Sequence, residues 1–422
     1  MFSKISQAFK VKEIRKKILF TLFIVIVFRL GTTIPVPGID TSVIKNMVEN
    51  NSLLGLYNMF SGGAFSNFTI FALGISPYIT ASIIIQLLTA GFESLKELQK
   101  SGEEGKKKIS KYTRTTALAL GIIQAIGITL GIVRSALKVN SPFFIATVII
   151  TLVAGSMLVM WLGDRITEKG LGNGSSVIIF VGIISRLPID IIAIYEKSSL
   201  GLLKWPAIVA VAVVMIFTII GVTFISESTR KIPVQYAKRV VGRKMYGGES
   251  SHIPMKVNQS GVMPIIFASS ILALPQTVAL LGGPKMQQAV NSFFNLSTNQ
   301  GFWTYRSIEI VLIVVFSYFY NTISFNTEDI SKNMKNSGGF IPGVRPGNPT
   351  EKYLNGILSK LTIVGAAFLG IMALIPALIT HYMKVPVNFG GTSLLIVVGV
   401  ALELKRQLES NLVMKNYQGF LK

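Results

Sequence analysis

The chain has 422 residues, of which half are hydrophobic and only 14% are charged, and its formal net charge is +22. A soluble chain normally carries about a quarter charged residues, so this composition and a mean hydropathy of +0.57 indicate a lipid environment. The lack of cysteine excludes disulfides and thiolate metal sites, and the two histidines, His252 and His381, have no metal-ligand spacing.

Apolar runs that could cross a bilayer recur along the whole chain. A hydrocarbon core of about 30 Å requires about 20 apolar residues. Ten such runs are predicted spans, and they lie at 18–37, 69–90, 114–134, 143–163, 175–195, 205–226, 261–281, 307–327, 361–380 and 389–404. The first run is long and nine more follow it, so we expect a retained span and not a cleaved signal peptide. The predicted fold class is an all-α membrane protein.

Basic residues are concentrated in every second connection. Of the 41 lysines and arginines, 30 fall in the segments 1–17, 91–113, 164–174, 227–260, 328–360 and 405–422. An excess of positive charge marks the cytoplasmic side of a membrane protein. Both termini, including the C-terminal tail 405–422, are therefore predicted to be cytoplasmic, as an even number of spans requires.

Three cytoplasmic segments suggest more than an orientation signal. In the N-terminal tail 1–17, Phe2, Ile5 and Phe9 share one helical face beside lysines, which predicts an interfacial amphipathic helix that anchors the chain or contacts a partner. The loops 227–260 and 328–360 are far longer than orientation requires, and such loops usually bind a partner. Their charge suits nucleic acid, a ribosome or anionic lipid headgroups, and these alternatives stay open.

The predicted spans contain few ionisable groups. Arg29 lies near the end of the first span, from where its side chain could extend to the interface, and Glu309 lies at the entrance of the eighth. Ion-coupled transporters usually carry ionisable groups at mid-membrane, so this scarcity argues against a pump. Gly105-Lys106 and Gly172-Asn173-Gly174 lack the other residues of phosphate-binding and dinucleotide-binding loops. We therefore predict no cofactor and no catalytic residue, and any energy for transport must come from a partner.

One apolar segment is too short and too broken to span. Residues 53–68 are interrupted by Ser61, Gly62 and Gly63, which fits either a short re-entrant helix or an interfacial loop with aromatic anchors. Prolines are expected to kink two of the spans. Pro77 lies in the second span, and Pro264 and Pro275 lie in the seventh.

Seven segments resemble the SecY family, the channel subunits of Sec protein translocases, and they follow in the family's order. They are IPVPGID (34–40), NMFSGGAFSNFTIFALGISPYITASIIIQLL (58–88), WLGDRITEKGLGNG (161–174), YAKRVVGR (236–243), SGVMPIIFASS (260–270), GGFIPGVRPG (338–347) and VPVNFGGTSLLIVV (385–398). The resemblance implies ten helices in two inverted five-helix halves, 18–196 and 197–404, hinged near 188–204. It also implies a lateral gate between the second span and the seventh and eighth.

The resemblance further implies a narrow pore with a plug. The family's aliphatic pore ring falls on Ile75, Ile79, Ser175, Ile179, Ile266 and Ile396. Branched apolar side chains disfavour water in a constriction and bond to nothing in a passing chain. Ser175 is polar and departs from this pattern, and from their spacing alone Ile75 and Ile79 would be assigned to lipid or core. The plug would be residues 53–66, centred on Leu56, Tyr57, Asn58, Met59, Phe60, Ser61, Gly62 and Gly63.

The function implied is a protein-conducting channel that passes unfolded secretory polypeptides and their signal sequences, and releases hydrophobic segments into the bilayer. The implied partners are a SecA ATPase or a ribosome, a SecE-like subunit and a SecG-like subunit, in a bacterial plasma membrane. The contacts with SecA or the ribosome would be made by Arg239, Arg243, Lys244 and Arg345, because arginine suits bidentate contact with phosphate or carboxylate. Two alternatives are a secondary transporter for a small solute and a membrane scaffold without a pore. Against the transporter, the polar residues Gln86, Gln124 and Asn321 are scattered and uncharged.

Overall fold

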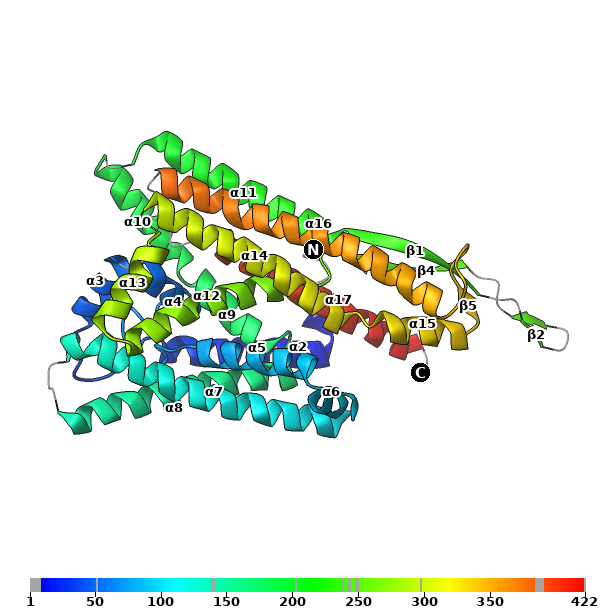
Figure 1. Cartoon of the computed structure of the whole chain (residues 1–422), viewed down its shortest axis with the longest axis horizontal. Coiled ribbons are helices and arrows are strands. Elements are labelled where there is room, and N and C mark those ends of the chain that lie inside the picture. Colours follow the sequence, from blue (N-terminus) through cyan, green and yellow to red (C-terminus); the bar gives the residue numbers. More distant parts are fainter. Residues whose placement is uncertain are drawn as a thin grey trace.

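The structure, a computed structural model, describes residues 9–50, 52–137, 141–201, 203–236, 239–241, 244–246, 250–296, 298–383 and 391–420. Most of these residues are helical, and Figure 1 shows the long helices side by side along the longest axis of the molecule, with the strands projecting beyond one end. The predicted helical architecture is therefore confirmed, except that a small sheet is added to it.

The first half of the described chain forms nine α-helices. They are α2 (Lys12–Gly31), α3 (Thr41–Asn50), α4 (Ser52–Phe60), α5 (Ser76–Gly91), α6 (Glu93–Lys100), α7 (Glu103–Gly131), α8 (Pro142–Lys169), α9 (Gly174–Ile184) and α10 (Leu187–Ser199). The second half contains α11 (Trp205–Glu227), α12 (Met263–Leu281), α13 (Pro284–Phe294), α14 (Asn299–Ser324), α15 (Thr327–Asn336), α16 (Asn348–Met383) and α17 (Gly391–Phe420). Each predicted span overlaps one of these helices or, for the fifth, the consecutive pair α9 and α10.

In the described part of the chain, fewer than ten helices are long and apolar enough to cross a bilayer unaided. Among the described residues six qualify, and the bent pair of α5 and α6, which turns by 101°, would raise the number to seven. In the most apolar 18-residue stretch of α11, only 17% is buried inside the protein. Large apolar side chains such as Phe143 and Phe224 are also exposed, as expected where lipid is the solvent. The chain is therefore a multi-pass membrane protein.

Several helix ends differ from the predicted ends. The first span ends at Gly31, because Pro35 pairs with Thr69 in an isolated bridge instead of continuing the helix. The second begins at Ser76, and the kink expected at Pro77 is wrong because proline in the first turn removes no helical hydrogen bond. Pro264 likewise lies in the first turn of α12, whereas Pro275 is inside that helix.

The two long loops and the C-terminal tail are more ordered than predicted. α16 begins at Asn348, within the predicted loop 328–360, and α17 runs through the predicted tail to Phe420. In the loop 227–260, β1 (Thr229–Tyr236) pairs antiparallel with β4 (Ser250–Lys256), and β5 (Gly339–Phe340) of the other loop joins the free edge of β1. β2 (Arg239–Val241) and β3 (Lys244–Tyr246) form a separate hairpin.

The alternation of apolar and polar residues explains this sheet. Ile232 and Val234 point to the same face of β1 and are buried against residues of α15 and α16, whereas their neighbours along the strand are exposed. The sheet therefore fixes the base of the first long loop on the N-terminal part of α16, before the predicted span.

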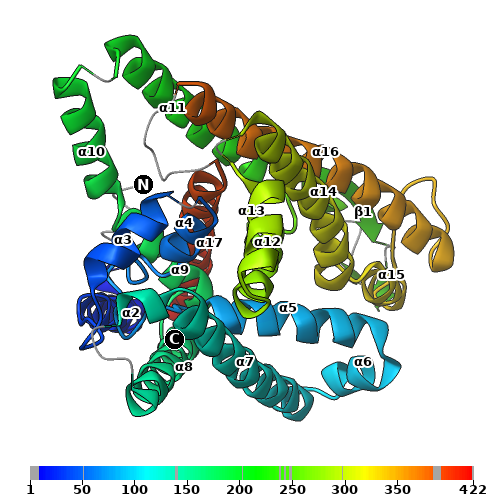
Figure 2. The same cartoon turned by 60° about the vertical axis from the view of Figure 1, so that its left-hand side comes forward.

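The largest hydrophobic core lies between the two predicted halves. It combines buried residues of α2, α5, α8 and α9 with buried residues of α11, α12, α14, α16 and α17. Figure 2 shows α12 lying between α5 and α14, and α12 contacts both of them as well as α7. A second core packs α3 and α4 against α7 and α8.

Candidate functional site

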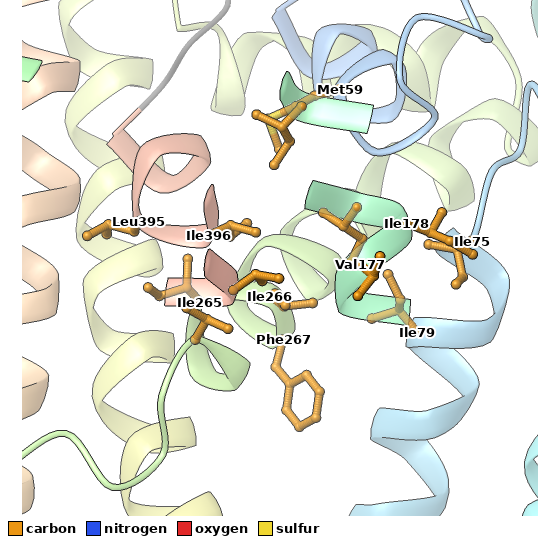
Figure 3. Close-up of a cluster of buried hydrophobic side chains, with 14 of the residues drawn as sticks. Met59, Ile75, Ile79, Val177, Ile178, Ile265, Ile266, Phe267, Leu395 and Ile396 are labelled. Atoms are coloured by element: carbon orange, nitrogen blue, oxygen red, sulfur yellow. The ribbon is translucent and has the colours of Figure 1, made fainter. Parts of the chain in front are cut away.

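Five of the six predicted ring residues lie in one buried cluster. Ile75, Ile79, Ile179, Ile266 and Ile396 are each at most 4% exposed and belong to the largest core. They come from the start of α5, from α9, from α12 and from α17. Figure 3 shows Ile266 and Ile396 close together, with Val177 and Ile178 of α9 to one side and Ile79 beside them. The cluster therefore joins four elements that are distant in the sequence.

The sixth predicted residue, Ser175, lies outside this cluster and has a local role. Its side chain is half-buried, and its hydroxyl donates to the Asn173 carboxamide oxygen at 2.7 Å. Asn173 caps α9 by accepting from the backbone N–H groups of Ser175 and Ser176. The start of α9 also passes very close to α8, because a Cβ added at Gly174 would lie 1.8 Å from the Gly163 carbonyl oxygen.

Apolar neighbours that the motif did not assign complete the cluster. Val177, Ile178, Ile265, Phe267 and Leu395 are buried with the five isoleucines. Phe267 packs edge-on against Phe316 of α14, with ring centroids 5.7 Å apart. These residues lie close in sequence to the predicted ones. The continuous apolar runs around Ile179, Ile266 and Ile396 could therefore have identified them from the sequence.

The segment from α4 to Ser66 is seated against three helices. On α12, the Tyr57 hydroxyl contacts the Thr277 hydroxyl and donates to the Ala273 carbonyl at 3.4 Å. On α17, the Ser393 hydroxyl donates to the Met59 sulfur at 2.7 Å. On α9, Gly182 meets Gly62 so closely that a Cβ at Gly62 would lie 2.8 Å from the Gly182 Cα. The sequence left either a short re-entrant helix or an interfacial loop open for residues 53–68, and the structure has the short helix α4 there. The side chains of Leu56 and Phe60 lie outside the described residues.

The turn after α4 is held by its own side chains. The Asn58 carboxamide oxygen accepts from the Ser66 N–H at 2.9 Å, and the Ser61 hydroxyl oxygen accepts from the Phe65 N–H at 3.0 Å. Gly62 and Gly63 both have positive φ, of 66° and 89°, a conformation that glycine adopts without steric cost. The Gly pair therefore makes the bend that the sequence suggested.

Two predictions about charged groups in the spans are wrong. The Arg29 side chain does not extend to the interface, because its Nη1 donates to the Gly62 carbonyl at 3.2 Å and to the Ser185 hydroxyl at 2.8 Å. Glu309 is not at the entrance of its helix, because α14 begins ten residues earlier at Asn299. Glu309 is only 1% exposed and forms an ion pair with Arg306, which also lies over the Phe302 ring.

The predicted partner-binding residues lie beyond one end of the helical bundle. Arg239 and Lys244 belong to the β2–β3 hairpin, which Figure 1 shows projecting past α15. Arg345 is exposed in the turn between β5 and α16, which Gly343 and Gly347 frame with positive φ. Arg243 lies outside the described residues, as do the first eight residues of the N-terminal tail with Phe2 and Ile5.

Comparison with known proteins confirms the resemblance seen in the motifs. The SecY family model matches residues 69–405. The protein translocase subunit SecY of Streptomyces scabiei is 42% identical over 441 residues, with 100% of both chains covered. The protein translocase subunit SecY of Thermotoga maritima is 42% identical over 434 residues, with 100% of this chain and 98% of the relative covered.

Solved structures share the fold. A structure described as a protein-conducting channel aligns with a TM-score of 0.66 at 18% identity, covering 94% of this chain and 92% of that chain. A SecY whose plug domain is described as stabilising the closed state of the translocation channel aligns at 0.69 and 19% identity over the same shares of the two chains. Sec61 in a canine ribosome-channel complex aligns at 0.64 and 17% identity, again over 94% and 92%.

These matches give no support to a small-solute transporter. They all concern protein translocase subunits and protein-conducting channels. Because the family model covers most of the chain and relatives match its whole length at 42% identity, the chain belongs to the SecY family of protein translocase subunits, which are channels and not enzymes.

Proposed function

We propose that unfolded polypeptides cross the membrane through the buried isoleucine cluster, and that hydrophobic segments leave it sideways into the bilayer. The observation that carries the proposal is that Ile75, Ile79, Ile179, Ile266 and Ile396, from four elements, are buried in one core that joins the two predicted halves. A collar of this composition excludes water when it is closed. It can also widen around a passing chain, because its side chains form no hydrogen bonds that must be broken.

The plug is residues 53–66, seated against the collar in the closed channel. This assignment is supported by contacts of the segment with α9, α12 and α17, which are three helices that supply collar residues. The related SecY whose plug domain maintains a membrane seal supports the same role. Because Asn58, Ser61 and Ser66 are bonded within the segment, the plug can leave its seat as one folded unit.

Deletion of residues 56–63 tests this assignment. We expect the shortened chain to fold, because the deleted residues lie outside the long helices, and to conduct ions in planar bilayers that the full chain seals. The full chain with its co-purifying subunits is the reference. A deletion variant that is as tight to ions as this reference would remove the plug assignment.

The lateral exit lies between the second span, α5, and the seventh and eighth spans, α12 and α14. α5 and α12 contact each other directly and belong to different predicted halves, so parting them opens the collar toward lipid. The halves, 18–196 and 197–404, turn about the connection from α10 to α11. The chain is proposed to adopt the ten-span arrangement of its family with both termini cytoplasmic, since the basic residues of the strand-bearing loops mark that side.

A docked partner drives transport, because no nucleotide-binding loop is present in the sequence. The two cytoplasmic loops receive a SecA ATPase or a ribosome through Arg239, Arg243, Lys244 and Arg345. Sec61 in the canine ribosome-channel complex supports the second partner. Arg345 is exposed in the turn between Gly343 and Gly347, where a guanidinium can make bidentate contacts. The charge reversal Arg345→Glu should abolish partner-driven translocation into vesicles, and normal translocation would exclude this contact.

A SecE-like subunit and a SecG-like subunit are the expected companions in a bacterial plasma membrane. The poorly buried α11 leaves an apolar face on which such a membrane subunit can pack. Purification of the chain from its native membrane in mild detergent tests this expectation. The absence of any small co-purifying membrane subunit would contradict it.

A further inference from the structure

A cationic side chain links the proposed plug to the wall of the channel. Arg29 belongs to α2, and its Nη1 donates to the carbonyl oxygen of Gly62, in the turn after α4, at 3.2 Å. Gly62 is buried, and among the described residues no other donor reaches this carbonyl. A buried carbonyl that loses its donor carries the full cost of desolvation.

The same nitrogen also reaches the opposite side of the seat. Arg29 Nη1 donates to the Ser185 hydroxyl at 2.8 Å, directly after α9. The Ser185 hydroxyl in turn donates to the Gly182 carbonyl at 2.8 Å. Gly182 is the residue against which Gly62 packs, since a Cβ at Gly182 would lie 3.2 Å from the Gly62 Cα. Arg29, Ser185, Gly182 and Gly62 therefore form a ring of contacts at the point where the turn after α4 packs against α9.

We propose that Arg29 is a latch that holds the plug in its closed seat, an assignment that rests on the proposed function of residues 53–66. When the plug moves, the contacts of Gly62 with Arg29 and with Gly182 are lost together. Once Gly62 leaves Gly182, Arg29 loses the Gly62 carbonyl as an acceptor and keeps the Ser185 hydroxyl. Arg29 thereby sets the ratio of seated to released plug, although it belongs to neither the collar nor the plug.

The chemistry of arginine suits this position. A hydrogen bond from a charged donor is stronger than one between neutral groups, and the planar guanidinium fixes the directions of both bonds. The cation is also poorly hydrated compared with an ammonium group, so a partly buried site costs it less. A neutral side chain at residue 29 would leave the plug held by apolar contacts and by the bonds of Tyr57 and Met59.

Ion conductance of the full chain, purified with its co-purifying subunits, tests the latch. Arg29→Met removes both hydrogen bonds and should raise resting conductance in planar bilayers about tenfold or more. Ser185→Ala keeps the cation but removes one acceptor and one donor, and should give a smaller rise. The matched control is Arg165→Met, which removes an arginine paired with Glu168 at the exposed end of α8 and should conduct as the unmodified chain does.

A thiol reporter gives a second measurement. Ser61 is fully buried in the plug, and the chain has no cysteine, so Ser61→Cys introduces a single thiol. A membrane-impermeant maleimide added from the external side should label this thiol about tenfold faster when Arg29→Met is also present.

The outcomes separate the latch from the plug. Unchanged conductance and unchanged labelling in Arg29→Met, with a leaking 56–63 deletion variant, would overturn the latch and leave the plug standing. A tight deletion variant would instead refute the plug on which the latch depends. If Arg29→Met fails to fold, Ser185→Ala decides, and its conductance must exceed that of Arg165→Met for the latch to hold.

Discussion

The contact between Gly62 and Gly182 predicts that one added methyl group opens the closed channel. In Gly62→Ala, the new Cβ would lie 2.8 Å from the Gly182 Cα, which is backbone and cannot rotate away. Overpacking of this kind typically costs about 1–3 kcal/mol. Because the clash exists only while the proposed plug is seated, the ratio of seated to released plug should fall by about 5-fold to 150-fold.

A second glycine separates this effect from backbone strain. The φ of Gly62 is 66°, and an alanine in that left-handed region costs about 1–2 kcal/mol by itself. Gly102 has a φ of 81° and a ψ of −145° just before α7, a conformation that is essentially restricted to glycine, and no atom lies within 4 Å of an added Cβ. Gly102→Ala therefore carries backbone strain without the clash. It should lower the thermal stability of the chain but leave its conductance unchanged.

The assay is single-channel and bulk ion conductance of the resting translocase in planar bilayers. Gly62→Ala should leak ions, and it should do so in the absence of any partner or substrate. The reasoning would be refuted if Gly62→Ala were no leakier than Gly102→Ala, because the close approach of the two glycines would then carry no energy.

Two further predictions concern the folding of the site. Asn173→Ala removes the cap of α9 and should cost about 1 kcal/mol in unfolding free energy, measured as a lower melting temperature in detergent, whereas Asn173→Asp should retain the cap. An equal loss in both variants would contradict the capping role. Glu309→Gln leaves the Arg306 cation buried without its carboxylate and should cost about 3–5 kcal/mol. The double variant Arg306→Met with Glu309→Gln should recover part of that loss, and a purely additive loss would count against a buried ion pair.

The apolar runs were sufficient to predict where helices lie, but not where they end. Hydropathy falls where a span leaves the membrane, whereas a helix such as α17 continues as long as its backbone hydrogen bonds are made. Pro77 illustrates the same limit, because its effect depends on whether it falls in the first turn or in the interior. The sequence patterns did not predict the short helices α3 and α13 or the sheet of β1, β4 and β5. The apolar residues of these elements recur over too few positions to be recognised within long polar connections.

The candidate site was predictable in its apolar part through family motifs. The motifs GISPYI and GVMPII located Ile75, Ile79 and Ile266, which the structure buries together. The polar contacts could not be predicted in this way. Arg29, Gly62 and Ser185 lie far apart in sequence, and their contacts depend on how α2, α9 and the turn after α4 pack. From the sequence alone, an arginine near the end of a span is expected to reach the interface, and only tertiary contact reverses that expectation.

Crosslinking of a stalled secretory polypeptide tests the central claim most directly. Because the chain has no cysteine, single thiols can be introduced by Ile75→Cys, Ile79→Cys and Ile266→Cys, with Val209→Cys on the exposed face of α11 as the control. A polypeptide held in transit should crosslink to the three cluster positions and not to residue 209. Absence of crosslinks at all three positions, or equal crosslinking at residue 209, would contradict passage through the isoleucine collar.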